Sequence, residues 1–179
     1  MTQHMMNTLK GDLTGLDFDI IVNAANEQLL PGGGVCGAIF EKAGHGLVQA
    51  CKDLKGCETG KAKITPAFDL PCKAIIHAVG PIYHDGNQNE SEYLTAAYWN
   101  SMAVAYDYMR SHELDQITIG FPCISTGIYG YPHDQACQIA VKTIKKLYSK
   151  YPETKNIHVT FVCYQQQDYQ LYKEELKKL

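Results

Sequence analysis

The sequence has no long hydrophobic run. Its longest stretch without Lys, Arg, Asp or Glu contains 117–132, is interrupted by Gly, Pro, Ser and Thr, and is shorter than the about 20 apolar residues of a membrane-spanning helix. Residues 1–10 have no basic segment followed by an apolar one, so we expect no signal peptide. Positive charge is not in excess either, because 16 Lys and Arg stand against 19 Asp and Glu. The net charge of −3 argues against a membrane-surface protein and against general binding to nucleic-acid phosphates.

No Cys-x-x-Cys pair is present, and the number of cysteines is odd. The seven cysteines are scattered at positions 36, 51, 57, 72, 123, 137 and 163. We therefore expect free thiols in a reducing cytoplasm, most of them buried as small apolar side chains. No pair has the spacing of a zinc knuckle, so we expect no metal site.

Two familiar nucleotide-binding patterns are incomplete. The glycines of 32–37 have the spacing of the dinucleotide fingerprint, but 26–31 separates them from the preceding strand, and no acidic residue ends a following strand about 20 residues later. Segment 56–61 resembles a P-loop but is one residue short, and Ala62 stands where Ser or Thr is needed. These departures exclude a Rossmann domain and a P-loop.

The apolar pattern predicts strands alternating with helices. Hydrophobic residues make up 45% of the 179, enough for a core. β-Branched runs without alternation, typical of strands covered on both faces, predict strands at 20–22, 74–79, 117–121 and 157–163, and more weakly at 1–10 and 61–65. Helical spacing predicts helices at 35–43, 46–54, 94–109, 136–151 and 169–179. We therefore expect one three-layer α/β/α domain over 1–179. Asn89 and Glu92 are expected to form a capping box, and the polar loop 80–89 to be the most mobile.

Two glycine-bearing loops are the strongest functional signal. Segment 31–34 precedes the helix expected at 35, and segment 125–130 follows the strand at 117–121. Each places backbone N–H groups near a helix N-terminus, where the helix dipole favours an anion and glycine allows close approach. One such loop is more often an ordinary turn. Two at the strand ends can hold a diphosphate from both sides, at the edge of the sheet where α/β proteins bind ligands.

Single polar residues near the strand ends have two interpretations each. Asn at a strand end can read a sugar hydroxyl with both amide groups, or it can form a turn or pin a loop; for Asn23 we prefer the second role. Asp12 can accept a hydrogen bond from a base amino group or cap a turn. His77 lies between Ile76 and Ala78, so we interpret it as a core histidine with satisfied hydrogen bonds.

Several segments occur in order along nearly the whole chain: GDLT at 11–14, IVNAAN at 21–26, GGGV at 32–35, CETG at 57–60, IHAVGP at 76–81 and STGIYGYP at 125–132. Together they resemble the macrodomain family, and most closely its MacroD-like class. The resemblance implies a mixed, mostly parallel sheet of about six strands with helices on both faces. It also implies ADP-ribose binding, with removal of ADP-ribose from acidic side chains or deacetylation of O-acetyl-ADP-ribose. Neither cofactor nor metal is implied, and the expected partners are ADP-ribose, ADP-ribosylated proteins or O-acetyl-ADP-ribose, bound by a cytoplasmic monomer without nucleic acid.

The resemblance also implies roles for residues at the matching positions. Asp12 would bind the adenine amino group with help from the Leu13 backbone, and Asn26 would bind the distal ribose hydroxyls. One side of the diphosphate would be lined by Gly33, Gly34 and Val35. The other side would be lined by Ser125, Thr126, Gly127, Ile128, Tyr129 and Gly130. Tyr129 would shield the distal ribose, and Tyr164 would lie against adenine unless it is an ordinary strand-end aromatic.

Cys36 departs from the family pattern, because hydrolytic MacroD-like members usually carry Asp directly after the GGGV run. That Asp helps orient or activate the water that attacks the distal ribose, and a neutral thiol is a weaker acceptor. Other macrodomains carry a small apolar residue here and still hydrolyse. The catalytic candidates are therefore Asn26, Cys36 and Tyr129. A hydrolase is the leading hypothesis, a non-catalytic ADP-ribose reader is the alternative, and the net charge disfavours a nucleic-acid or poly-ADP-ribose binder.

Overall fold

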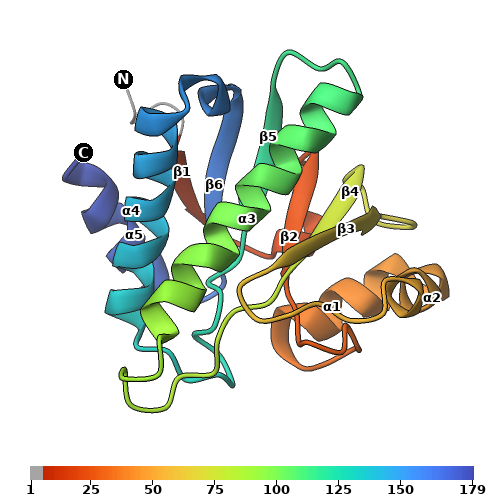
Figure 1. Ribbon diagram of the computed structural model, residues 1–179, viewed down its shortest axis with the longest axis horizontal. Helices are drawn as coiled ribbons and strands as arrows, with labels where there is room; N and C mark the ends of the chain where they lie inside the picture. Colours follow the sequence, from red (N-terminus) through yellow and green to blue (C-terminus); the bar gives the residue numbers. More distant parts are fainter. Residues whose placement is uncertain (1–5) are drawn as a thin grey trace.

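A six-stranded sheet with helices on both faces organises the chain (Figure 1). The computed structural model describes residues 6–179. The strands are β1 (Met6–Lys10), β2 (Ile20–Ala24), β3 (Ala62–Pro66), β4 (Ala74–Ala78), β5 (Ile117–Phe121) and β6 (Ile157–Cys163). Their order is β1-β6-β5-β2-β4-β3, and within the described chain only β3 pairs antiparallel. The expected mixed, mostly parallel sheet is confirmed, although 1–5 of the first expected strand lie outside the described residues.

The helices form two layers. They are α1 (Gly34–Ala43), α2 (His45–Asp53), α3 (Glu90–Ser111), α4 (His133–Lys150) and α5 (Gln166–Lys177), with short 3₁₀ turns η2 (Leu13–Gly15) and η3 (Pro152–Asn156). Helices α1 and α2 cover one face of the sheet, and α3, α4 and α5 cover the other (Figure 1). Each expected helix is present, with ends shifted by a few residues. None of these helices, over the described range, is long and apolar enough to cross a membrane.

Alternate residues of the central strands enter different cores. Ile20 and Val22 of β2 pack into the cluster that contains residues of α3 and α4, whereas Ile21 packs into the cluster that contains residues of α1 and α2. All three side chains are almost completely buried. Burying such a side chain contributes about 1.5–3 kcal/mol. The two-sided burial explains why the strand sequences show no polar alternation.

The start of α3 differs from the expected capping box. Asn89 lies in the left-handed region with φ 60°, and its side chain makes no capping hydrogen bond. The buried carboxylate of Glu90 instead turns back onto the preceding loop, where it accepts N–H groups at 2.7–3.2 Å from His84, Asp85, Gly86 and Gln88. These bonds lower the pKa of Glu90 to about 2, and the bond from His84 has the largest effect. They tie down the loop 80–89 and argue against the mobility expected from its polarity.

A buried polar pair joins β2 to β4. Asn23 and His77 are register partners, and the Asn23 amide Nδ2 donates to His77 Nδ1 at 3.1 Å. His77 Nε2 lies 2.9 Å from the Thr65 hydroxyl. Burial lowers the pKa of His77 to about 4, so it is neutral at pH 7 and is the satisfied core histidine that was expected. The turn or loop-pinning role for Asn23 is wrong, because this residue is fully buried inside a strand.

Candidate functional site

A pocket of about 660 Å³ opens at the carboxyl ends of the parallel strands. Its walls are formed by residues that directly follow β1, β2, β5 and β6, and by the first turns of α1 and α4. The chain passes from β2 to β4 on one side of β2 and then to β5 on the other, so the strand order reverses here. Open α/β sheets bind ligands at such a reversal, and the volume lies within the roughly 300–1,000 Å³ typical of small-molecule sites.

The first glycine loop forms the N-terminus of α1. The helix begins at Gly34, whose φ of 57° is easy only for glycine. A Cβ atom on Gly33 would lie 3.5 Å from the Ile128 side chain, so this loop faces the second one across the pocket. The backbone N–H groups of Gly33, Gly34 and Val35 have no hydrogen-bond partner among the described residues. They are therefore available to an anion.

The second glycine loop, 125–130, is fixed by hydrogen bonds with residues of the segment 80–83. Ser125 is buried and has a φ of 68°, and its hydroxyl donates to the Pro81 carbonyl at 2.8 Å. A Cβ atom on Gly80 would lie 2.2 Å from Ser125 Oγ, so only glycine allows this contact. The Tyr83 N–H donates to the Tyr129 carbonyl at 2.8 Å. Positive φ at a non-glycine residue costs energy and is concentrated at functional sites.

Any anion in this pocket would have to be bound by backbone N–H groups. The N–H groups of Gly127, Ile128 and Tyr129 have no partner in the described part of the chain. The residues that line the pocket, all within that part, include no Lys or Arg. An anion here would be bound by facing sets of N–H dipoles and the N-terminus of α1 rather than by a cationic side chain.

The structure brings the candidate site residues together. All of them line the pocket except Gly130, which lies just beyond it. Asp12 also fills the alternative role of a turn cap, because its Oδ1 accepts the Thr14 N–H at 3.0 Å and the Thr14 hydroxyl at 2.6 Å. These bonds lower the pKa of Asp12. Tyr164 is 80% exposed at the end of β6, where its ring is free to contact a ligand.

Cys36 and Tyr129 are both uncharged at neutral pH. Cys36 lies buried in the first turn of α1, with its Sγ 3.7 Å from the Leu30 carbonyl. Burial raises the pKa of this thiol. Burial also raises the pKa of the Tyr129 phenol, and the negative charge of Glu27 adds to that effect. The side chain at position 36 is therefore a thiol that can donate a weak hydrogen bond, not a ready-made base.

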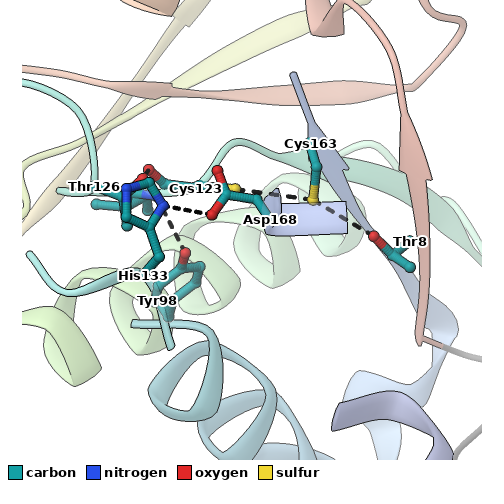
Figure 2. Close-up of polar contacts among 8 residues, drawn as sticks. Thr8, Tyr98, Cys123, Thr126, His133, Cys163 and Asp168 are labelled. Atoms are coloured by element: carbon teal, nitrogen blue, oxygen red, sulfur yellow. Dashed lines mark hydrogen bonds and ion pairs between the residues drawn. The ribbon is translucent and has the colours of Figure 1, made fainter. Parts of the chain in front are cut away.

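Sequence reasoning missed a polar group on the wall of the pocket. His133 Nδ1 of α4 lies 2.5 Å from Asp168 Oδ1 of α5, and both residues line the pocket with Cys123 (Figure 2). They are 35 positions apart, so no local spacing reveals the pair. The available signal was their position, because each lies in the first turn of the helix that follows a parallel strand. No His, Cys, Asp or Glu cluster suited to a metal ion occurs over 6–179.

The fold and the pocket define a three-layer α/β protein that presents two glycine loops to a ligand at the carboxyl edge of its sheet. The family model for the Macro domain matches residues 22–140. With the relatives described next, this match shows that the chain belongs to the macrodomain family.

Two relatives match along almost their full length, and two solved macrodomain structures have a similar fold. A Macro domain-containing protein of Chlorobaculum tepidum is 44% identical over 173 residues, covering 96% of this chain and 95% of its own. An O-acetyl-ADP-ribose deacetylase of Cronobacter sakazakii is 43% identical over 176 residues, with coverages of 96% and 93%. The Oceanobacillus iheyensis macrodomain with ADP has a TM-score of 0.82 at 38% identity, with coverages of 96% and 89%. The Trypanosoma brucei macrodomain in complex with ADP-ribose has a TM-score of 0.82 at 33% identity, with coverages of 95% and 68%.

Proposed function

We propose that this protein binds ADP-ribose and hydrolyses ADP-ribosyl esters, namely O-acetyl-ADP-ribose and mono-ADP-ribosylated acidic side chains. The observation that carries the proposal is the pair of facing loops, whose unpaired N–H groups suit a diphosphate in a pocket without cationic side chains. The relatives named O-acetyl-ADP-ribose deacetylase and the macrodomain structures with ADP or ADP-ribose support the choice of ligand.

The proposed ligand would extend across the pocket between its two ends. Its adenine would lie near Asp12 and Tyr164, which follow the adjacent strands β1 and β6. The diphosphate would lie between the two glycine loops, and the distal ribose would lie between Asn26 and Tyr129. Asn26 suits this role, since hydrogen bonds with the Leu30 backbone use one donor and one acceptor of its amide and leave one of each.

In the proposed reaction, a water molecule attacks the ester at the distal ribose. The ester bond breaks, the acid leaves as a carboxylate (acetate or the acidic side chain), the ribose keeps a hydroxyl group, and one proton passes to solvent. Asn26 orients the ribose hydroxyls, and Tyr129 covers the sugar and limits the entry of other water. The neutral thiol of Cys36 contributes little basicity, so the phosphate of the substrate positions the water. The protein acts on this ligand as a monomer, with 1–179 as one domain.

A non-catalytic ADP-ribose reader is the second candidate. The observation that favours it is Cys36, because burial keeps this side chain protonated where a carboxylate would help to activate water. The two functions share the same bound ligand and differ only in turnover.

Single-turnover assays distinguish the two functions. Enzyme in excess over O-acetyl-ADP-ribose, or over a protein carrying Glu-linked ADP-ribose, should release product faster than buffer does. Release of product at the buffer rate, with ADP-ribose bound, would establish the reader. Absence of both binding and turnover would reject the proposed function.

A further inference from the structure

Two thiols meet at the base of the pocket. Cys163 ends β6, and Cys123 follows β5 by two residues, so each lies two positions beyond the register partners Phe121 and Phe161. Their sulfur atoms are 3.9 Å apart, as the dashed line between them in Figure 2 shows. A disulfide has a sulfur–sulfur length of roughly 2.05 Å, so the two sulfurs must approach each other by about 2 Å. Cys123 lies beyond the last paired residue of β5, so rotation of the side chains and a small shift of this loop residue can supply that approach.

The two thiols differ in exposure. All seven cysteines, each within the described range, are free, and among them Cys123 alone is not buried. Cys123 lines the pocket, whereas Cys163 is completely buried behind it. A small oxidant that enters the empty pocket would reach Cys123 first and would find Cys163 directly behind it.

We propose that Cys123 and Cys163 form a modification site, a dithiol that a hydroperoxide entering through the pocket oxidises to a disulfide. The Cys123 sulfur attacks the peroxide oxygen, the O–O bond breaks, and Cys123 becomes a sulfenic acid. The alcohol, or water from hydrogen peroxide, leaves with the thiol proton. The Cys163 sulfur then attacks the Cys123 sulfur and expels hydroxide, which takes the Cys163 proton and leaves as water. Two thiols and one hydroperoxide thus give one disulfide, one alcohol and one water.

The surroundings of the pair support this order of steps. In the reduced pair, the hydrogen bond from the Cys123 thiol and, to a smaller extent, that with the Thr8 hydroxyl at 3.6 Å lower the pKa of Cys163. After the first step the Thr8 hydroxyl still lies beside the Cys163 sulfur, which is the attacking atom of the second step. The bond with Cys163 and burial raise the pKa of Cys123, which makes the first step slow. The pair therefore responds to sustained peroxide rather than to traces.

Ligand occupancy and oxidation are coupled through the position of Cys123. Its carbonyl accepts the Thr126 hydroxyl at 2.9 Å and so anchors the second glycine loop. A ligand between the loops covers the route by which peroxide reaches the sulfur. The disulfide itself does not depend on the proposed function. Protection by ADP-ribose does, and a binding titration on the same sample separates the two.

The test uses the full chain with and without hydrogen peroxide. We expect intact mass spectrometry to show the loss of two hydrogens and peptide mapping to link Cys123 to Cys163, with reversal by dithiothreitol. The link should be absent in Cys123→Ser and in Cys163→Ser. It should persist in Cys72→Ser, a matched control whose thiol is buried away from the pocket. Thermal unfolding of each variant checks that it is folded.

The results of this experiment test separately the disulfide, the access of peroxide through the pocket, and the binding of ADP-ribose. Saturating ADP-ribose, with binding confirmed by titration, should slow formation of the link several-fold. Oxidation of Cys123 to sulfinic acid without a link would overturn the proposal. A link that forms equally fast in the ligand-bound protein would overturn the pocket as the route of access. If titration shows no ADP-ribose binding while the link still forms, the proposed function fails and the modification site stands.

Discussion

The side-chain amide of Asn26 forms two hydrogen bonds with a single residue, Leu30. Its Oδ1 accepts the Leu30 N–H and its Nδ2 donates to the Leu30 carbonyl, both at 2.9 Å. The same carbonyl lies 3.7 Å from the Cys36 sulfur. A residue expected to bind ribose thus also fixes the segment that leads into the first glycine loop. These two roles predict that a substitution of Asn26 lowers both the stability of the protein and its affinity for the ligand.

We predict that Asn26→Ala lowers both stability and ADP-ribose affinity. Each lost hydrogen bond costs about 0.5–1.5 kcal/mol, and a loose loop presents its N–H groups less well. Denaturant unfolding and calorimetric titration measure the two effects. Asn100→Ala is the control, because it removes a comparable bond, from Nδ2 to the Gly60 carbonyl at 2.7 Å, outside the pocket lining. Equal losses of affinity in both variants would contradict the ligand role of Asn26.

For Asp12→Ala we expect weaker ADP-ribose binding by about 1.5–3 kcal/mol, the value of a hydrogen bond to a charged group. Loss of the turn cap should also cost about 0.5–2 kcal/mol of stability. The exposed pair with Lys42, 3.2 Å long, adds little. Asp12→Asn keeps a cap acceptor and should recover most of the stability. Ribose 5-phosphate, which has no adenine, is the control ligand; if its affinity falls as much, Asp12 does not read the base.

Glu90→Gln should lower stability in a pH-dependent way. The pKa of Glu90 is about 2 in the folded protein, below its ordinary 4.5, so the unfolded state binds the proton more tightly. The stabilisation is complete above about pH 4.5 and is lost as the pH falls toward 2. The difference in unfolding free energy between wild type and variant should therefore shrink from pH 7 to pH 3.

The control for Glu90→Gln is Glu92→Gln, an exposed carboxylate in the same helical turn. It should change stability little at any pH. The Glu90 variant should also weaken ADP-ribose binding, because the loop it holds leads through Tyr83 to the Tyr129 carbonyl. A stability difference that is the same at pH 3 and pH 7 would show that the carboxylate charge is not what holds the loop.

Cys36→Asp should raise the rate of hydrolysis with little change in ADP-ribose affinity. A carboxylate beside the attacking water acts mainly in the transition state. Cys36→Ala should cost little, because the thiol is neutral. Single-turnover rates and titrations of both variants are the measurements. A large loss of rate in Cys36→Ala, with binding unchanged, would instead show that the thiol takes part in catalysis.

The sequence allowed most of the fold to be predicted, because β-branched runs and helical spacing are local signals. The runs predicted at 20–22, 117–121 and 157–163 lie inside β2, β5 and β6, and the run at 74–79 extends one residue beyond β4. The predictions for Asn89 and Asn23 failed because the hydrogen bonds at these positions depend on other residues. Asn89 makes no capping hydrogen bond, and Glu90 instead binds N–H groups of the preceding loop. His77 binds Asn23 across the strand register.

The candidate site was predictable only in part. The two loops and Asp12 follow strand ends, so their meeting at one edge follows from parallel strands. The pairs His133–Asp168 and Cys123–Cys163 join residues 35 and 40 positions apart, and only the packing of α4, α5 and β6 reveals them. The contact of Ser125 with Pro81 is likewise invisible in the sequence, since it depends on the backbone approach at Gly80.

The most direct measurement of the central claim is a calorimetric titration of the purified full chain with ADP-ribose. The account predicts saturable binding at one site, tighter than for ribose 5-phosphate. Ligand at 100 times its dissociation constant should stabilise the fold by about 2.7 kcal/mol. No heat of binding and no thermal shift at millimolar ADP-ribose would contradict it.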